Sequence, residues 1–172
     1  MNILLTIKEQ DIVPNAPEIN SASFYRREAA RGVVLDGDNQ VYLLNVALYN
    51  YHKLPGGGID EGEDKETAMK RECREEIGCD IEIIAKLGKI IEYRDQFKLI
   101  QTSHCYIARQ VGEQRLSTFE PSEIAEGFRT IKALNIEDAI RIIEQDKSND
   151  YGSKFMRKRE LAILQVAKQK GF

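Results

Sequence analysis

The chain has 172 residues, of which 42% are hydrophobic and 31% charged, an ordinary composition for one folded domain with a hydrophobic core. Its net charge of -3 does not favour a nucleic-acid-binding protein, because binding a phosphate backbone normally requires a basic surface. No segment approaches the roughly 20 apolar residues that cross a bilayer, and the first residues lack the pattern of a secretory signal. We therefore expect a cytoplasmic protein with no membrane contact.

The sequence alternates between strand-like and helix-like segments. Residues 1–20 include Pro14 and Pro17 and are expected to form an N-terminal extension, either loosely ordered or part of a homodimer contact. Strands are then predicted over residues 29–35, 41–46, 81–93, 97–108 and 128–134, and helices over 63–77, 136–145 and 153–170. A glycine-rich loop is expected at 53–58 and a polar loop at 118–127. The pattern predicts an α/β or α+β sandwich in a single domain, residues 1–172.

The predicted helix at 63–77 concentrates acidic side chains on one face. Glu72, Glu75 and Glu76 lie at positions i, i+3 and i+4, so they are neighbours on that face. Like charges at this spacing repel, and partial burial increases the cost. A divalent cation would remove the conflict, and oxygen-only ligands select magnesium, manganese or calcium over zinc. The alternative is a solvated, charge-rich helix.

The segment at 57–79 resembles the Nudix box, whose pattern is G-x5-E-x7-R-E-U-x-E-E-x-G-U, with U a bulky apolar residue. All fixed positions match, and they are Gly57, Glu63, Arg71, Glu72, Glu75, Glu76 and Gly78. Cys73 and Cys79 occupy the two apolar positions, where cysteine is smaller than the usual residue. The resemblance implies a Nudix-type α/β/α sandwich, with a mixed β-sheet between helices.

The same resemblance implies a role for each residue of the box. Four groups would bind Mg²⁺, or Mn²⁺ in its place: the Gly57 carbonyl and the carboxylates of Glu72, Glu75 and Glu76. Arg71 and Glu63 would form an orienting ion pair, with Gly56 and Gly58 supporting the loop. Arg71, Glu75 and Glu76 would take part in catalysis, and Glu75 or Glu76 would assist an attacking water. The implied reaction is Mg²⁺-dependent hydrolysis of a diphosphate bond in a nucleoside diphosphate linked to another group.

Relatives of this kind often carry another glutamate well after the box, as a metal ligand or general base. Glu120, Glu123 and Glu126 compete for that role here, in a segment that otherwise resembles an ordinary acidic surface loop. Glu123 is the first choice, because it lies in the loop just before the strand predicted at 128–134.

Substrate contacts are harder to assign from the sequence. Lys53 directly precedes the glycine loop, and Arg26 and Arg27 are further candidates to contact phosphate, while Tyr51 is a candidate to stack on a base. The basic run that ends in Arg159 is interpreted as a solvated helix face.

Three functions therefore stay open. The first is hydrolysis of a small nucleotide-like diphosphate. The second is removal of pyrophosphate from RNA 5′ ends, which the negative net charge of the chain disfavours. The third is nucleotide binding without catalysis, which the intact box disfavours.

Overall fold

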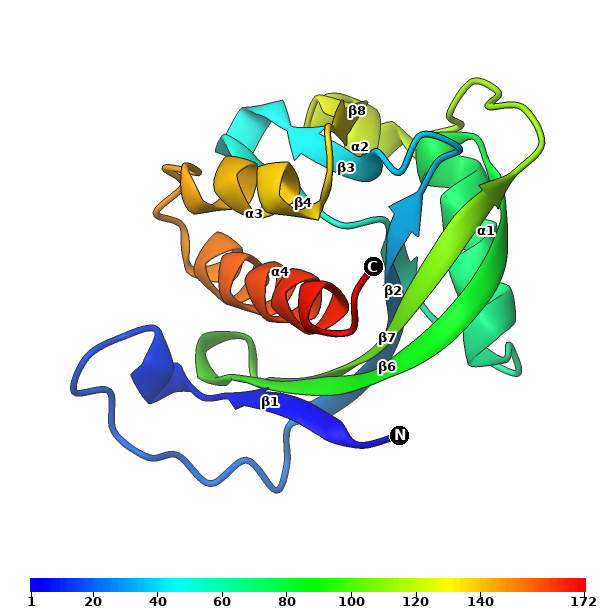
Figure 1. Ribbon diagram of the computed structural model, residues 1–172. Coiled ribbons are helices and arrows are strands. Elements are labelled where there is room, and N and C mark those ends of the chain that lie inside the picture. Colours follow the sequence, from blue (N-terminus) through cyan, green and yellow to red (C-terminus); the bar gives the residue numbers. More distant parts are fainter.

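The computed structural model describes residues 1–172 and contains one mixed eight-stranded sheet with helices on both faces (Figure 1). The strands are β1 (Ile3–Ile7), β2 (Tyr25–Leu35), β3 (Val41–Val46), β4 (Tyr51–Lys53), β5 (Gly56–Gly58), β6 (Asp80–Arg94), β7 (Leu99–Val111) and β8 (Phe128–Ala133). The helices are α1 (Lys65–Ile77), α2 (Pro121–Ala125), α3 (Ile136–Glu144) and α4 (Tyr151–Gln169). The strand order is β1-β6-β7-β2-β3-β4, with β5 added to β2 and β8 to β3.

Each face of the sheet is covered by a separate hydrophobic core. On one face, α1 packs through an apolar stripe that includes Met69, Cys73 and Ile77, all without exposed surface. On the other face, α3 and α4 contribute residues such as Ile143 and Phe155 to a larger core. Figure 1 shows α1 on one side of the long β6–β7 pair and α3 with α4 on the other. The expected α/β/α sandwich is confirmed, because helices cover both faces of a mixed sheet.

Several elements differ in extent from the sequence prediction. Strand β2 begins at Tyr25 rather than residue 29, because its first residues pair in parallel with β7. Residues 3–7 form strand β1, which pairs in parallel with β6 at the edge of the sheet. The local sequence pattern does not predict either pairing, because the partner strands β6 and β7 lie far from β1 and β2 in the sequence. No helix of the protein combines the length and apolarity that a membrane span requires.

The prediction of a glycine-rich loop at 53–58 is wrong in part, because Gly56–Gly58 forms the short strand β5. It runs antiparallel to β2, with Gly57 opposite Ala30. Gly56 has φ of +131°, and a Cβ atom there would lie 2.2 Å from the Ala30 carbonyl oxygen. Glycine at this position therefore allows the backbone to pack directly against β2.

We expect Gly56→Ala to lower the free energy of unfolding by at least about 2 kcal/mol, because backbone atoms of β2 cannot move aside and the required φ is unfavourable for alanine. Urea denaturation measures the effect. Gly37→Ala is the matched control: it adds a Cβ atom with no atom within 4 Å, so its stability should stay within about 0.5 kcal/mol of the wild type. Equal stability of the two variants would contradict a structural requirement for glycine at position 56.

The prediction that the basic run of α4 is a solvated face is wrong for Arg159, whose side chain is completely buried. Its Nη1 atom donates to Glu92 Oε2 at 3.0 Å, and its Nη2 atom donates to Glu160 Oε1 at 2.6 Å. Arg94 also donates to Glu92, at 2.8 Å. We call Glu92, Arg94, Arg159 and Glu160 the buried ion cluster. Burial raises the pKa of Glu92, but the two arginines outweigh it and the net shift is downward.

Candidate active site

Helix α1 has well-defined ends that fix the rotation of its acidic face. Asp64 caps the first turn, and its Oδ1 atom accepts hydrogen bonds from the backbone amides of Glu66 and Thr67. Gly78 ends the helix in the left-handed conformation, with φ of +67°. With the apolar stripe packed on the sheet, the acidic face of α1 turns toward β5 and the end of β4.

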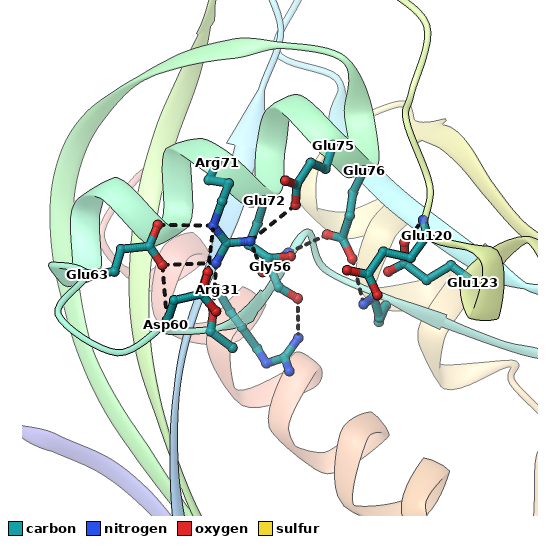
Figure 2. Close-up of polar contacts among 12 residues, drawn as sticks. Arg31, Gly56, Asp60, Glu63, Arg71, Glu72, Glu75, Glu76, Glu120 and Glu123 are labelled. Atoms are coloured by element: carbon teal, nitrogen blue, oxygen red, sulfur yellow. Dashed lines mark hydrogen bonds and ion pairs between the residues drawn. The ribbon is translucent and has the colours of Figure 1, made fainter.

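This face borders a polar cavity of about 470 Å³, which we call the acidic cavity. Its lining residues are Arg27, Arg31, Lys53, Gly56, Gly57, Gly58, Asp60, Arg71, Glu72, Glu75, Glu76, Glu120 and Glu123. Figure 2 shows most of these side chains, with Glu120 and Glu123 reaching toward Glu76 from the far side. No hydrophobic side chain lines the cavity, so it suits a highly charged ligand rather than an apolar one.

Glu76 is the most buried of the three box carboxylates, with 2% of its side chain exposed. Its Oε1 atom accepts from Lys53 Nζ at 2.8 Å, and its Oε2 atom accepts from the Gly56 amide at 2.6 Å. Burial raises the pKa of Glu76, while Lys53 and the amide oppose the rise. Glu76 therefore joins α1 to both ends of the β4–β5 connection.

Glu72 lies directly against the glycine segment. A Cβ atom on Gly57 would come within 2.4 Å of both Glu72 carboxylate oxygens, so any larger residue would displace that carboxylate. Burial, reinforced by the nearby charge of Glu76, raises the pKa of Glu72 to about 7 even though Arg71 opposes the shift. Two carboxylates thus share a poorly solvated location beside the Gly57 backbone.

Arg71 is the central cation of the site. Its Nε and Nη2 atoms form a bidentate ion pair with Glu63, each at 3.0 Å, and Nη2 also donates to the Gly58 carbonyl at 2.9 Å. Its Nη1 atom donates to Glu72 at 2.8 Å and to Glu75 at 3.2 Å. Arg71 therefore ties the segment before α1 to two of the box carboxylates (Figure 2).

In this arrangement no three acidic, histidine or cysteine side chains are spaced to hold a metal ion. All three box carboxylates instead form ion pairs with cationic side chains: Glu76 with Lys53, and Glu72 and Glu75 with Arg71. Glu75 is the least confined of the three, with 41% of its side chain exposed.

Two of the three downstream glutamates reach the acidic cavity. Glu120 and Glu123 line it, and Glu123 Oε2 accepts a hydrogen bond from the Glu120 amide at 2.9 Å, which begins α2. Glu126 does not line the cavity; it ends α2 and hydrogen-bonds through its backbone.

Only some of the residues predicted to contact substrate line the acidic cavity. Lys53 lines the cavity but is paired with Glu76. Arg26 and Tyr51 do not line it, and Tyr51 is buried beside Tyr49 instead. The neighbouring residue of β2, Arg27, does line the cavity, because successive side chains of a strand point to opposite faces.

Sequence reasoning missed Arg31, a buried arginine of β2 that donates from Nη1 to the Gly56 carbonyl at 2.8 Å. Burial, together with the charge of Arg159, lowers the pKa of Arg31 to about 10, so its guanidinium stays charged at neutral pH. The peptide of Gly56 is therefore held on both sides, by Arg31 at its carbonyl and by Glu76 at its amide. Arg27 was already a candidate from the sequence, and its spacing from Arg31, which places both on one face of β2, is the signal that could have found Arg31 as well.

The fold and the site together define an α/β protein with a carboxylate-rich cavity formed by a glycine strand and the helix after it. Comparison with known families gives a match to the NUDIX domain over residues 25–156. The chain therefore belongs to the Nudix family.

Individual relatives agree with this assignment. An RNA pyrophosphohydrolase of Campylobacter jejuni is 40% identical over 99 residues, which are 57% of this chain and 58% of the relative. The chain thus matches less than two thirds of that relative's length. Among solved structures, the E. coli ORF135 protein has a TM-score of 0.58 at 14% identity, covering 86% of this chain and 91% of that one. A MutT protein from Methanosarcina mazei has a TM-score of 0.57 at 12% identity, covering 87% and 99%. These two structures show a shared fold.

Proposed function

We propose that the protein is a divalent-metal-dependent hydrolase that cleaves a diphosphate bond in a nucleotide-like substrate. The observation that carries this proposal is the convergence of the box carboxylates, the glycine strand and two further glutamates on one wholly polar cavity. Membership of the Nudix family and relatives named RNA pyrophosphohydrolase support the same class of reaction.

The donor set suits Mg²⁺, with Mn²⁺ as a substitute. The candidate ligands are all oxygens: the carboxylates of Glu72, Glu75 and Glu76 and the Gly57 carbonyl, which are hard ligands that favour these cations. The carboxylates of Glu72 and Glu76 lie close together where solvent access is poor, and a bound cation would relieve their electrostatic repulsion. Binding requires Glu72 and Glu75 to exchange their contacts with Arg71 for contacts with the metal.

When bound, Mg²⁺ would neutralise diphosphate charge and lower the pKa of a water. The remaining roles belong to this chain. Arg71 keeps the glycine segment and Glu63 in place, while Lys53 and the Gly56 amide hold Glu76. Glu75, exposed at the cavity, and Glu123 from the opposite side are the groups placed to accept a proton from an attacking water, with Glu120 the alternative to Glu123.

The activity is tested by incubating the purified full chain with nucleoside triphosphates, nucleotide sugars, ADP-ribose and dinucleoside polyphosphates in the presence of Mg²⁺. Release of phosphate or pyrophosphate, or of a nucleoside monophosphate, from at least one class is the expected result. Tight nucleotide binding without hydrolysis of any compound would instead support a non-catalytic binding protein.

Metal dependence gives a separate prediction. Chelation should abolish hydrolysis and added Mg²⁺ or Mn²⁺ should restore it, while Glu72→Gln should weaken Mn²⁺ binding by at least about tenfold in calorimetric titration, because it removes a charged ligand. Glu82→Gln, an exposed residue of β6, is the matched control and should bind Mn²⁺ like the wild type. The absence of Mn²⁺ binding by the wild type, with and without substrate, would contradict the proposed ligand role.

Removal of pyrophosphate from RNA 5′ ends is the second candidate, and the named relatives favour it. A 5′-triphosphorylated RNA oligonucleotide competed against the preferred small substrate distinguishes the two. Preference for the RNA would also overturn the expectation that nucleic acid is not a partner.

A further inference from the structure

The cations of the acidic cavity differ in how far the protein itself neutralises them. Lys53 is paired with Glu76, and Arg71 is paired with three glutamates. Arg31 is buried and donates to the Gly56 carbonyl. Arg27 alone among these four cations is exposed and forms neither an ion pair nor a bond to the glycine segment. Its positive charge is therefore available to a ligand.

The side chain of Arg27 is nevertheless held in one direction. Its Nη1 atom donates to Gln101 Oε1 at 3.0 Å, and its Nη2 atom lies over Gly58, where an added Cβ atom would be 3.0 Å away. Nη1 is the one guanidinium nitrogen of Arg27 with a protein acceptor, so donors on Nε and Nη2 stay free. The guanidinium thus lies beside the glycine segment with unused donors.

Gln101 connects Arg27 to the buried ion cluster. Gln101 is 1% exposed, and its Nε2 atom donates to Glu92 Oε2 at 3.2 Å. The same oxygen accepts from Arg159 Nη1 at 3.0 Å. Because Glu92 can only accept and Arg27 can only donate, the amide of Gln101 can adopt only one of its two orientations. A continuous chain of hydrogen bonds therefore runs from α4 through β6 and β7 to an arginine in the cavity.

We propose that Arg27 binds a phosphate oxygen of the diphosphate substrate and that Gln101 is the positioning residue that aims it. This inference rests on the proposed function for the identity of the ligand. A guanidinium with free, adjacent donors matches the two oxygens of a phosphate group, and its place above Gly58 puts it on the opposite side of the glycine segment from the helix carboxylates. A metal ion held by the carboxylates of α1 and the guanidinium of Arg27 would then bind the diphosphate from two directions.

The test measures binding rather than turnover, so that its result is separate from the hydrolysis screen. Methylenediphosphonate, which cannot be hydrolysed, is titrated calorimetrically into the full chain with Mg²⁺ at neutral pH. Arg27→Ala should weaken binding about tenfold to hundredfold, the range for a lost charge-assisted hydrogen bond, and Arg27→Lys should recover only part of it. Arg129→Ala removes an exposed arginine of β8 outside the cavity and should bind like the wild type.

Gln101→Met tests the positioning role, because it keeps the length of the side chain and removes its hydrogen bonds. We expect it to weaken binding severalfold in the wild type and to have no further effect in Arg27→Ala, since Gln101 acts through Arg27. An equal loss in both backgrounds would overturn the positioning role of Gln101. Binding by Arg27→Ala within about twofold of the wild type, or no binding by the wild type, would overturn the phosphate site. If every compound in the hydrolysis screen is inert but diphosphonate binding depends on Arg27, the proposed activity fails and this site stands.

Discussion

Glu75→Gln is expected to reduce the rate of diphosphate hydrolysis by roughly 10² to 10⁴-fold, the range for loss of a general base. The substitution keeps the shape of the side chain but removes both the negative charge and the capacity to accept a proton. Initial rates at saturating Mg²⁺ and substrate measure the effect on kcat.

Glu75 allows an unusually clean experiment because it contributes little to the fold. Its side chain is 41% exposed, and its single ion pair, to Arg71 at 3.2 Å, is a helix pair at i,i+4. Such pairs stabilise proteins by only about 0.3–0.5 kcal/mol, so the unfolding transition should barely move. Glu76 offers no comparable test, since its substitution would also disturb Lys53 and the Gly56 amide.

Glu66→Gln is the matched control on the same helix. Glu66 is a partly exposed glutamate of the first turn that pairs with Lys86 and does not line the acidic cavity. It should retain full activity. If Glu75→Gln and Glu66→Gln hydrolyse substrate equally well, Glu75 has no part in the reaction.

Arg159→Met is expected to lower the free energy of unfolding by about 3–5 kcal/mol, because it leaves Glu92 and Glu160 buried without their main partner. Combining it with Glu92→Gln and Glu160→Gln should recover much of the loss, since the cost comes from uncompensated charge rather than from lost packing. Urea denaturation of the single and triple variants measures both effects. Lys158→Met, the neighbouring residue with a partly exposed ion pair, should change stability by less than about 1 kcal/mol.

The effect of Arg159→Met should also depend on pH. In the wild type the folded-state pKa of Glu92 is lowered from 4.5, so its contribution to stability is present above that value and is lost as the pH falls through the folded-state pKa. Without Arg159, the largest of the charges that lower the pKa of Glu92 is lost and only Arg94 opposes burial, so this pKa is higher than in the wild type and protonation relieves the penalty at a higher pH. The difference in stability between variant and wild type should therefore shrink as the pH falls toward 4.5. A difference that is constant from neutral to acidic pH would show that lost packing, not charge, is responsible.

The sequence by itself determined the helix of the site and the face that carries its carboxylates. The spacing of Glu72, Glu75 and Glu76 is local, and so is the alternation with the apolar stripe of Met69, Cys73 and Ile77; helical geometry converts both into faces without further information. The alternation of strand and helix periodicities indicated a sandwich of strands and helices, and the α/β/α arrangement was implied by the resemblance of the box.

Tertiary structure alone decided which arginines outside the box are buried and which line the cavity. Arg31 and Arg159 resemble surface residues in a linear sequence, because an arginine is normally solvated, yet both are buried, Arg31 on β2 and Arg159 on α4. The sequence could not decide between Arg26 and Arg27, because the register of β2 against β5 and β7 is set by long-range pairing, and a shift of one residue reverses which side chain faces the cavity. Local spacing can specify a helix face, but the partners of a buried charge depend on strands and helices that are brought together only by folding.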